Sequence, residues 1–144
     1  MRGVSAVTFT QSVKTVLAKY ATFDGRAPRS EYWWFALFVF LASIPLSLID
    51  QMVVAPALGF ESFKEDTPQL LSMVFSLALL LPGITVAVRR MHDLDKSGWW
   101  VLIVFIPLLG ILLMLYWFVQ AGTNGSNRFG PDPIESHQQV PNLN

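Results

Sequence analysis

The 144-residue sequence contains no cysteine, which excludes a disulfide framework, a thiolate nucleophile and a zinc–thiolate site. Charged residues make up only 14% of the chain, against about 25% in soluble domains, and they occur in clusters. Ten basic and ten acidic residues cancel, so the chain lacks the positive excess that supports nucleic-acid binding. Hydrophobic residues instead make up 53%, which indicates an integral membrane protein.

Three long runs without charge occupy most of the sequence, and we predict membrane-spanning helices over about 32–54, 70–88 and 99–119. About 20 helical residues, each rising about 1.5 Å, cross the roughly 30 Å hydrocarbon core of a bilayer. The runs lack the period-two alternation of a membrane β-barrel. The sequence therefore predicts an all-α polytopic membrane protein with about three transmembrane helices, in one domain over 1–133 followed by a flexible tail at 134–144.

The third run allows a second interpretation. It contains Pro107-Leu108-Leu109-Gly110, where a chain reversal would turn the run into a re-entrant hairpin. Each arm would have about eight or nine residues, too few to cross a bilayer core. The hairpin would bring the C-terminal segment back to the loop after the second run. We expect a single crossing, and the hairpin is the alternative.

Lysine and arginine are unevenly distributed between the segments that flank the runs. Five precede Tyr32, one lies in the first loop, three lie in the second loop and one lies in the tail. Because cytoplasmic segments carry an excess of Lys and Arg, we predict that the N-terminus and the second loop face the cytoplasm. With three crossings, the first loop and the tail would face the other side.

Two further features predict contact with the headgroup level of the membrane. Apolar residues at Phe9, Val13, Val16, Leu17 and Tyr20 form one stripe of a short N-terminal amphipathic helix. That helix is expected to lie on the cytoplasmic leaflet or to pack on the second loop. Tryptophan favours the headgroup level, and the predicted interface aromatics are Trp33, Trp34, Trp99, Trp100 and Trp117.

Polar residues cluster at the ends of the predicted spans. The neighbours His92 and Asp93 suggest a proton acceptor oriented by a carboxylate, and Arg89 stands four residues before Asp93, where the two can pair. Metal sites usually need three or four ligands at matched spacing, and the pattern does not supply them. We therefore assign no catalytic residue, metal or cofactor. The candidate polar cluster comprises Arg26, Arg29, Glu31, Arg89, Arg90, His92, Asp93, Asn127, Arg128 and Asp132.

The order and spacing of these motifs resemble the DUF805 family of small bacterial membrane proteins. The matching motifs are Phe23-x-Gly25-Arg26-Ala27-x-Arg29-x-Glu31-Tyr32-Trp33, Arg89-Arg90-x-His92-Asp93, Ser97-Gly98-Trp99-Trp100, Ile106-Pro107-x-x-Gly110 and Gly122-x-x-Gly125-x-Asn127-Arg128-Phe129-Gly130-Pro131-Asp132-Pro133. The resemblance implies a multi-pass protein of the bacterial inner membrane. It implies no reaction, because the family's biochemical role is not established.

Three function hypotheses follow. The first is a non-enzymatic protein that binds lipid headgroups or a partner protein through basic and aromatic motifs at the membrane edge. Its basic patch on the cytoplasmic leaflet would comprise Arg26, Arg29, Arg89, Arg90 and Lys96. Expected partners are membrane lipids, with a second copy of the chain or a membrane partner protein left open. The second is a small oligomeric transporter or channel, for which Asp50 is the nearest ionisable group to membrane depth. The third is a membrane-embedded enzyme that uses His92 and Asp93. We favour the first.

Overall fold

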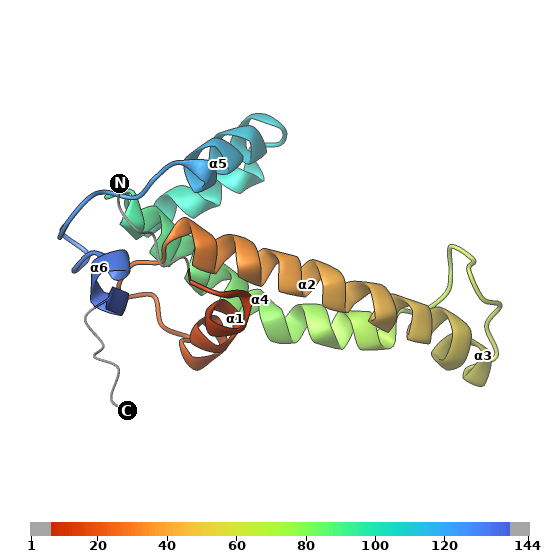
Figure 1. The fold of residues 1–144 in the computed structure, drawn as a ribbon. Coiled ribbons are helices and arrows are strands. Elements are labelled where there is room, and N and C mark those ends of the chain that lie inside the picture. Colours follow the sequence, from red (N-terminus) through yellow and green to blue (C-terminus); the bar gives the residue numbers. More distant parts are fainter. Residues whose placement is uncertain (1–6, 139–144) are drawn as a thin grey trace, which may run out of the picture. The chain divides into compact units, whose positions relative to one another are not determined.

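The computed structural model describes residues 7–138 (Figure 1), and the chain divides into two compact units. The first unit comprises residues up to 35 and from 82 onward, and the second comprises 36–81. Helices α2 (Arg29–Ile49) and α4 (Leu70–Asp93) contribute residues to both units. Within the described chain there is no strand, and one isolated β-bridge pairs Asn127 with Gly130. The all-α prediction is confirmed.

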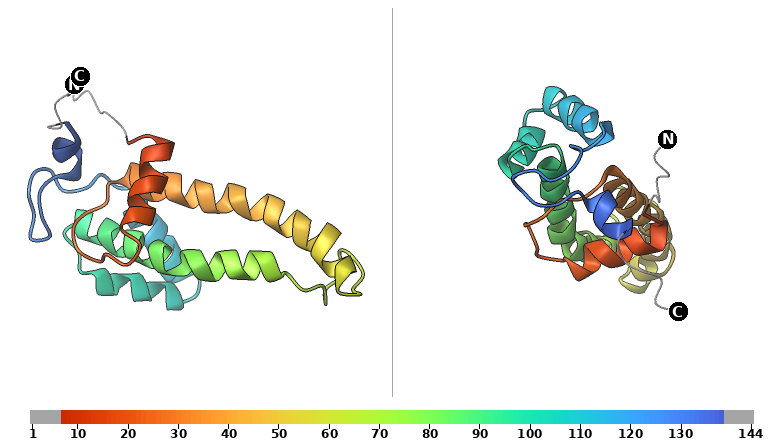
Figure 2. Two further views of the ribbon diagram at one scale, coloured as in Figure 1. Left: turned by 90° about the horizontal axis from the view of Figure 1, so that it is seen from below. Right: turned by 60° about the vertical axis from the view of Figure 1, so that its left-hand side comes forward.

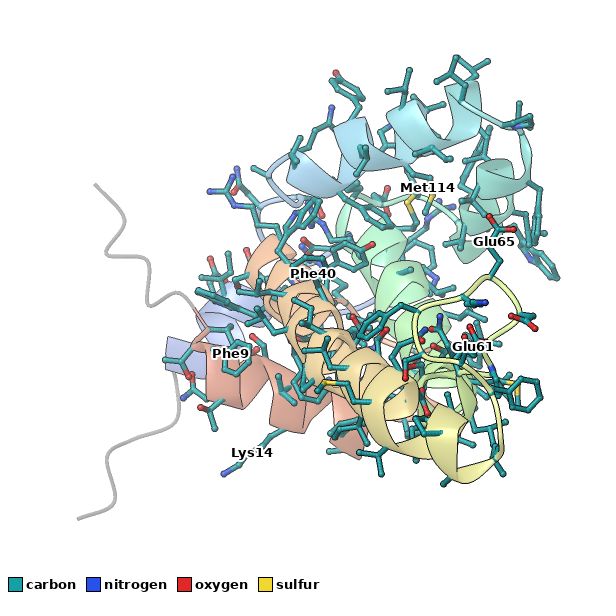
Figure 3. The ribbon with its side chains drawn as sticks, turned by 90° about the vertical axis from the view of Figure 1, so that its right-hand side faces the viewer. Phe9, Lys14, Phe40, Glu61, Glu65 and Met114 are labelled. Atoms are coloured by element: carbon teal, nitrogen blue, oxygen red, sulfur yellow. The ribbon has the colours of Figure 1, made fainter. Side chains whose placement is uncertain are left out.

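Two helical segments are long and apolar enough to cross a membrane. The first runs over Arg29–Ala57 and joins α2, the π-helix η1 (Asp50–Val54) and α3 (Ala55–Ala57), and the second is α4. Only 11% and 22% of their most apolar windows are buried, whereas a core helix of a soluble protein would be mostly buried. Figure 3 shows Phe40 pointing away from α2, in agreement with its 62% exposure. These helices agree with the runs predicted over 32–54 and 70–88.

In the second unit, Asp50 links η1 to the start of α4. Its carboxylate is fully buried and accepts hydrogen bonds from the backbone N–H groups of Leu71 (2.9 Å) and Ser72 (2.8 Å). These N–H groups have no partner inside the helix, and a carboxylate also suits the positive end of the helix dipole. Gln51 similarly accepts a bond from the N–H of Phe63 in the connecting loop. Asp50 therefore has a defined structural role.

Helix α1 (Phe9–Ala18) is the predicted short N-terminal helix. It begins with a capping box in which the Thr8 side chain and Gln11 satisfy each other's backbone N–H groups. Ser12 and Val16 are fully buried, while Leu17 on the predicted stripe is 39% exposed. Figure 3 shows the labelled Lys14 projecting outward from the helix. One face of α1 thus packs on protein, and another leaves apolar and basic groups exposed.

The third run is a hairpin of two helices, not the single helix expected over 99–119. The 3₁₀ helix η2 (Gly98–Phe105) and helix α5 (Leu109–Val119) lie side by side in both Figure 1 and Figure 2. The rings of Trp100 and Trp117, at opposite sequence ends of the run, approach to 5.6 Å. At the rises of 3₁₀ and α-helices each arm is roughly 16 Å long, about half of a bilayer core. The segment therefore has the chain reversal of the alternative interpretation.

The reversal has a local cause at Pro107–Gly110. Leu108 adopts a left-handed φ of 62°, and the N–H of Leu109 donates to the carbonyl of Pro107 over 2.7 Å. Gly110 allows the arms to approach closely, because a Cβ there would lie 1.8 Å from the Ile103 carbonyl oxygen. Any side chain at that position would push the two backbones apart.

The segment after α5 returns to the first unit and ends in α6 (Pro133–Gln138). This short helix lies where the sequence predicts a flexible tail over 134–144. Asp132 explains its start, because the carboxylate accepts the N–H of Ile134 (2.9 Å) and the Asp132 carbonyl accepts that of Ser136. Residues 139–144 of the predicted tail lie outside the described residues.

Candidate functional site

A buried ionic network in the first unit joins three segments that are distant in sequence. Arg26, from the loop before α2, contacts Asp93 at the end of α4 through Nε (3.0 Å) and Nη2 (2.9 Å). The same guanidinium donates to the carbonyls of Thr123 and Gly125, both at 2.6 Å. Both charged side chains are at most 4% exposed. The loop, α4 and the segment after α5 are therefore held at one place.

Arg90 connects the same carboxylate to the end of α5. Its Nη1 lies 2.5 Å from Asp93 Oδ2, and its Nη2 donates to the carbonyls of Phe118 (3.3 Å) and Gln120. The backbone N–H of Thr123 in turn donates to the Asp93 carbonyl over 2.8 Å. The C-terminal end of the hairpin is therefore fixed to the end of α4.

Arg89 forms a second buried pair, with Glu31 in the first turn of α2. Arg89 Nη1 and Glu31 Oε1 are 2.6 Å apart, and the side chains are 0% and 2% exposed. The N–H of Ala27 also donates to the Arg89 carbonyl over 3.0 Å. In the described part of the chain, Nε and Nη2 of Arg89 have no hydrogen-bond partner. The charge of Arg89 is therefore balanced by Glu31 alone.

These contacts correct two pairings inferred from the sequence. Arg89 pairs with Glu31 and not with Asp93, and the partner of Asp93 on its own helix is Arg90, three residues away. Asp93 also does not orient His92, because its two oxygens face Arg26 and Arg90. Sequence spacing limits which residues can meet on one helix, but it cannot reveal a competing charge from another segment.

His92 is held by three contacts of its own. Its Nδ1 lies 3.1 Å from the carbonyl oxygen of Gly25, and its ring stacks on Phe129 at 3.9 Å and 3°. The Asn127 side-chain amide donates to the His92 carbonyl over 2.8 Å. These contacts connect the loop before α2 to the segment after α5 a second time.

The remaining predicted polar residues lie around this network. The Arg29 side chain is exposed and forms no hydrogen bond or ion pair within residues 7–138. Arg128 is 60% exposed and pairs with Asp95, with Nε 3.2 Å from the carboxylate. Asp132 is buried, and its second oxygen accepts the N–H of Gly125 over 3.1 Å. The structure thus buries most of the predicted cluster and leaves Arg29 and Arg128 at the surface.

The predicted interface aromatics differ in their contacts. Trp33 donates from Nε1 to the carbonyl of Phe118 over 3.2 Å, and Trp34 meets the edge of Phe9 at 5.9 Å. Trp99 is 79% exposed. The placement of these rings at the headgroup level stays a prediction.

Gly122 is a residue that sequence reasoning missed as part of the site. A Cβ at this position would lie 2.0 Å from Oδ2 of Asp93, so only glycine lets the carboxylate reach both arginines. Turns are the usual explanation for glycines in a motif this rich in Gly, Asn and Pro. Gly122 lacks the left-handed φ that marks Gly125 and Gly130, and close packing on Asp93 explains it better.

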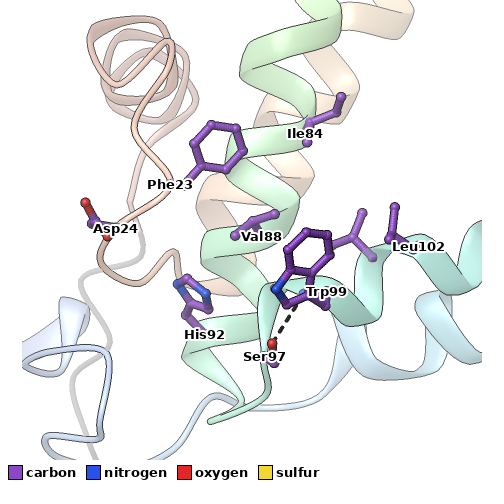
Figure 4. A pocket seen from close by; sticks show the side chains of 10 residues that line it. Phe23, Asp24, Ile84, Val88, His92, Ser97, Trp99 and Leu102 are labelled. Atoms are coloured by element: carbon purple, nitrogen blue, oxygen red, sulfur yellow. Dashed lines mark hydrogen bonds between the residues drawn. The ribbon is translucent and has the colours of Figure 1, made fainter.

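A pocket of about 400 Å³ lies beside the network in the first unit (Figure 4). Ligand pockets typically measure about 300–1,000 Å³. Most of the pocket wall is apolar, and its polar groups are Asp24, His92 and Ser97. The apolar wall comes from the loop before α2, from α4 and from η2, through Phe23, Ile84, Val88, Trp99, Val101 and Leu102. Among the described residues, no group of three His, Cys, Asp or Glu could hold a metal ion.

Comparison with known proteins assigns the chain to a family. Residues 20–131 match the family model described as protein of unknown function (DUF805). The chain belongs to the DUF805 family. It is 41% identical over 118 residues to inner membrane protein YhaH of Escherichia coli (strain K12), covering 82% of this chain and 92% of that protein. It is 40% identical over 119 residues to inner membrane protein YhaI of the same organism, covering 83% and 92%. No solved structure matches the chain.

Family membership and the apolar helices together make this chain an integral membrane protein. Its relatives are inner membrane proteins of Escherichia coli, and the family description names no activity. The residues that form the buried network all lie within the matched range 20–131, apart from Asp132. The function must therefore be argued from the site itself.

Proposed function

We propose that this DUF805 protein is a non-enzymatic inner-membrane protein that binds a membrane lipid in the pocket beside α4 and η2. The observation that carries the proposal is the pocket, whose apolar wall has polar groups at one part only. A lipid has the same division between an apolar chain and a polar head. The pocket wall exposes the apolar side chains of Trp99 (79%), Leu102 (51%) and Ile84 (40%), and covering them with a lipid chain is favourable because it removes apolar surface from water.

The basic residues at the membrane edge contribute less to headgroup binding than the sequence suggests. Arg26, Arg89 and Arg90 are at most 5% exposed and are occupied by carboxylates and carbonyls. Arg29 and Lys96 remain as exposed or partly exposed cations on the same unit. We infer that the buried arginines hold the hairpin in place and that only the other two contact headgroups.

The hairpin also supports a topology with two full crossings and one re-entrant segment. The tail is fixed to the end of α4 by the Thr123 to Asp93 backbone bond. The second loop is rich in basic residues, so the positive-inside rule assigns it to the cytoplasm. The N-terminus, the second loop and the tail are then all cytoplasmic, and the loop between η1 and α4 faces the periplasm.

Cysteine accessibility tests this topology directly, because the chain has no native cysteine. Ser62→Cys, Ser97→Cys and Ser126→Cys would be probed one at a time in intact cells with a membrane-impermeant thiol reagent. We expect only Ser62→Cys to react, with all three reacting after the cells are opened. Labelling of Ser126→Cys in intact cells would show that the chain crosses a third time.

Retention of lipid tests the pocket. Ile84→Trp would place an indole ring in the pocket where a smaller aliphatic side chain stands. Leu77→Trp is the matched control because Leu77 lies two turns earlier on α4 and is 61% exposed. The proteins would be released from phospholipid nanodiscs and analysed by native mass spectrometry. We expect wild type and Leu77→Trp to retain phospholipid and Ile84→Trp to lose it. Equal retention by all three would refute lipid binding in this pocket.

The transporter and enzyme hypotheses conflict with the contacts of Asp50 and His92, the residues on which they were based. A transport role for Asp50 conflicts with its two hydrogen bonds to the first turn of α4, which occupy both carboxylate oxygens. A catalytic role for His92 conflicts with its separation from the Asp93 carboxylate, which two arginines hold. His92 instead lines the pocket.

A further inference from the structure

The hydrogen bonding of His92 determines which chemistry it offers to the pocket. A backbone carbonyl can only accept, so the contact between Nδ1 and the Gly25 oxygen requires a proton on Nδ1. In the neutral ring, Nε2 then carries a lone pair and accepts hydrogen bonds. His92 and Gly98 both line the pocket. His92 Nε2 faces Gly98, because a Cβ built on Gly98 would lie 3.3 Å from it. The pocket therefore holds an acceptor from His92.

Asp24 supplies a second acceptor with a negative charge. It lines the same pocket, is exposed, and has no ion pair or hydrogen bond with any described residue (Figure 4). No lysine or arginine is among the described residues that line the pocket. The neighbouring Arg128 pairs with Asp95 and lies over Phe129, so it has other partners. The polar part of the pocket thus favours a positive group that donates hydrogen bonds.

We infer that the pocket selects lipids whose headgroup carries a primary ammonium, which donates to His92 Nε2 and pairs with Asp24. This inference rests on the proposed function and specifies its ligand. A primary ammonium has three N–H donors, whereas a quaternary ammonium has the same charge and none. An anionic headgroup would be repelled by the carboxylate of Asp24, because no lysine or arginine among the described lining residues offsets that charge. The selectivity therefore depends on donors as well as charge.

The test compares three phospholipids with the same acyl chains. Wild-type protein in nanodiscs with equal parts of phosphatidylethanolamine, phosphatidylcholine and phosphatidylglycerol would be released and its retained lipid counted by native mass spectrometry. We expect phosphatidylethanolamine to exceed phosphatidylcholine by about tenfold, the effect of one charge-assisted hydrogen bond. Asp24→Asn removes the charge of an exposed side chain that has no hydrogen bond or ion pair with any described residue. We expect it to reduce this preference, with the remainder coming from donation to His92 Nε2. Glu135→Gln, an exposed carboxylate outside the pocket, is the control and should keep it.

The outcomes separate this inference from the proposed function. Equal retention of phosphatidylethanolamine and phosphatidylcholine, or a preference that Asp24→Asn leaves unchanged, overturns the ammonium assignment. If Ile84→Trp still abolishes retention in that case, lipid binding in the pocket stands without headgroup selectivity. If Ile84→Trp retains as much lipid as wild type, both are refuted. Preference for phosphatidylglycerol would instead show that exposed cations such as Arg29 select the headgroup.

Discussion

The pair between Glu31 and Arg89 is the contact whose removal should most clearly destabilise the protein. The two side chains are 2% and 0% exposed, and among the described residues Glu31 is the only carboxylate paired with Arg89. Removal of one partner from a buried ion pair costs about 3–5 kcal/mol, since a charge stays buried without its counterion. Among the described residues, Nε and Nη2 of Arg89 have no hydrogen-bond partner, so no other contact shares the charge that loss of Glu31 would leave. We expect Glu31→Leu and Arg89→Met each to lower the free energy of unfolding by about 3–5 kcal/mol.

The double variant separates a buried pair from a simple loss of packing. Leucine and methionine can fill the space without charge, and such replacements of buried pairs are often neutral or stabilising. We therefore expect Glu31→Leu combined with Arg89→Met to be more stable than either single variant. Arg128→Ala is the control, because that pair with Asp95 is 60% and 48% exposed and should contribute less than about 1 kcal/mol.

Tryptophan fluorescence during thermal unfolding in a fixed detergent would measure these differences, since the chain has five tryptophans. A loss of 3–5 kcal/mol corresponds to a decrease in Tm of roughly 10–20 °C for a chain of this size. The control should decrease Tm by no more than a few degrees. The reasoning is refuted if the single variants match Arg128→Ala, or if the double variant loses the sum of the two single effects.

Further predictions concern glycine and Asp50. Gly122→Ala should lower the free energy of unfolding by about 3 kcal/mol or more, because its Cβ would overlap the Asp93 carboxylate at 2.0 Å. In the same assay this loss corresponds to a decrease in Tm of more than about 10 °C. Gly83→Ala should leave Tm unchanged or raise it slightly, since nothing lies within 4 Å of its Cβ and alanine favours helix; a large decrease would contradict the described packing of α4. Gly110→Ala should open the hairpin and increase protease cleavage near residue 108, and a cleavage pattern like that of wild type would contradict the close approach of the two arms. Asp50→Ala removes the carboxylate that caps α4 and should destabilise the start of that helix by about 1–2 kcal/mol. Hydrogen exchange at the first turn of α4 should become faster, and unchanged exchange would contradict the capping role of Asp50.

Some of the architecture could be predicted from local sequence alone. The runs that became α2 and α4 are apolar over more than a bilayer thickness, and the hydrophobic effect acts on each run wherever its neighbours lie. The cap of α1 likewise depends on residues three positions apart, Thr8 and Gln11. The polar motifs identified the segments that form the site, and most of their charged members are indeed buried together.

The partners within that site could not be predicted. Arg26 and Asp93 are 67 positions apart, and Glu31 and Arg89 are 58 apart, so their pairing depends on how the helices pack. Spacing along one helix predicted Arg89 with Asp93, but Arg26 and Arg90 hold that carboxylate. The function assigned to the basic patch changes for the same reason, since burial removes three of its arginines from contact with lipid.

The sequence by itself determined that this chain enters a membrane, where its two long helices lie and which residues carry its polarity, because these properties depend on hydrophobicity summed over neighbouring residues. The tertiary structure alone decided that the third apolar run folds back on itself. Length and hydropathy allow that run either to cross or to return. The choice depends on the close approach of Gly110 to Ile103 and on carbonyl contacts from Arg26 and Arg90, which exist only when distant segments meet.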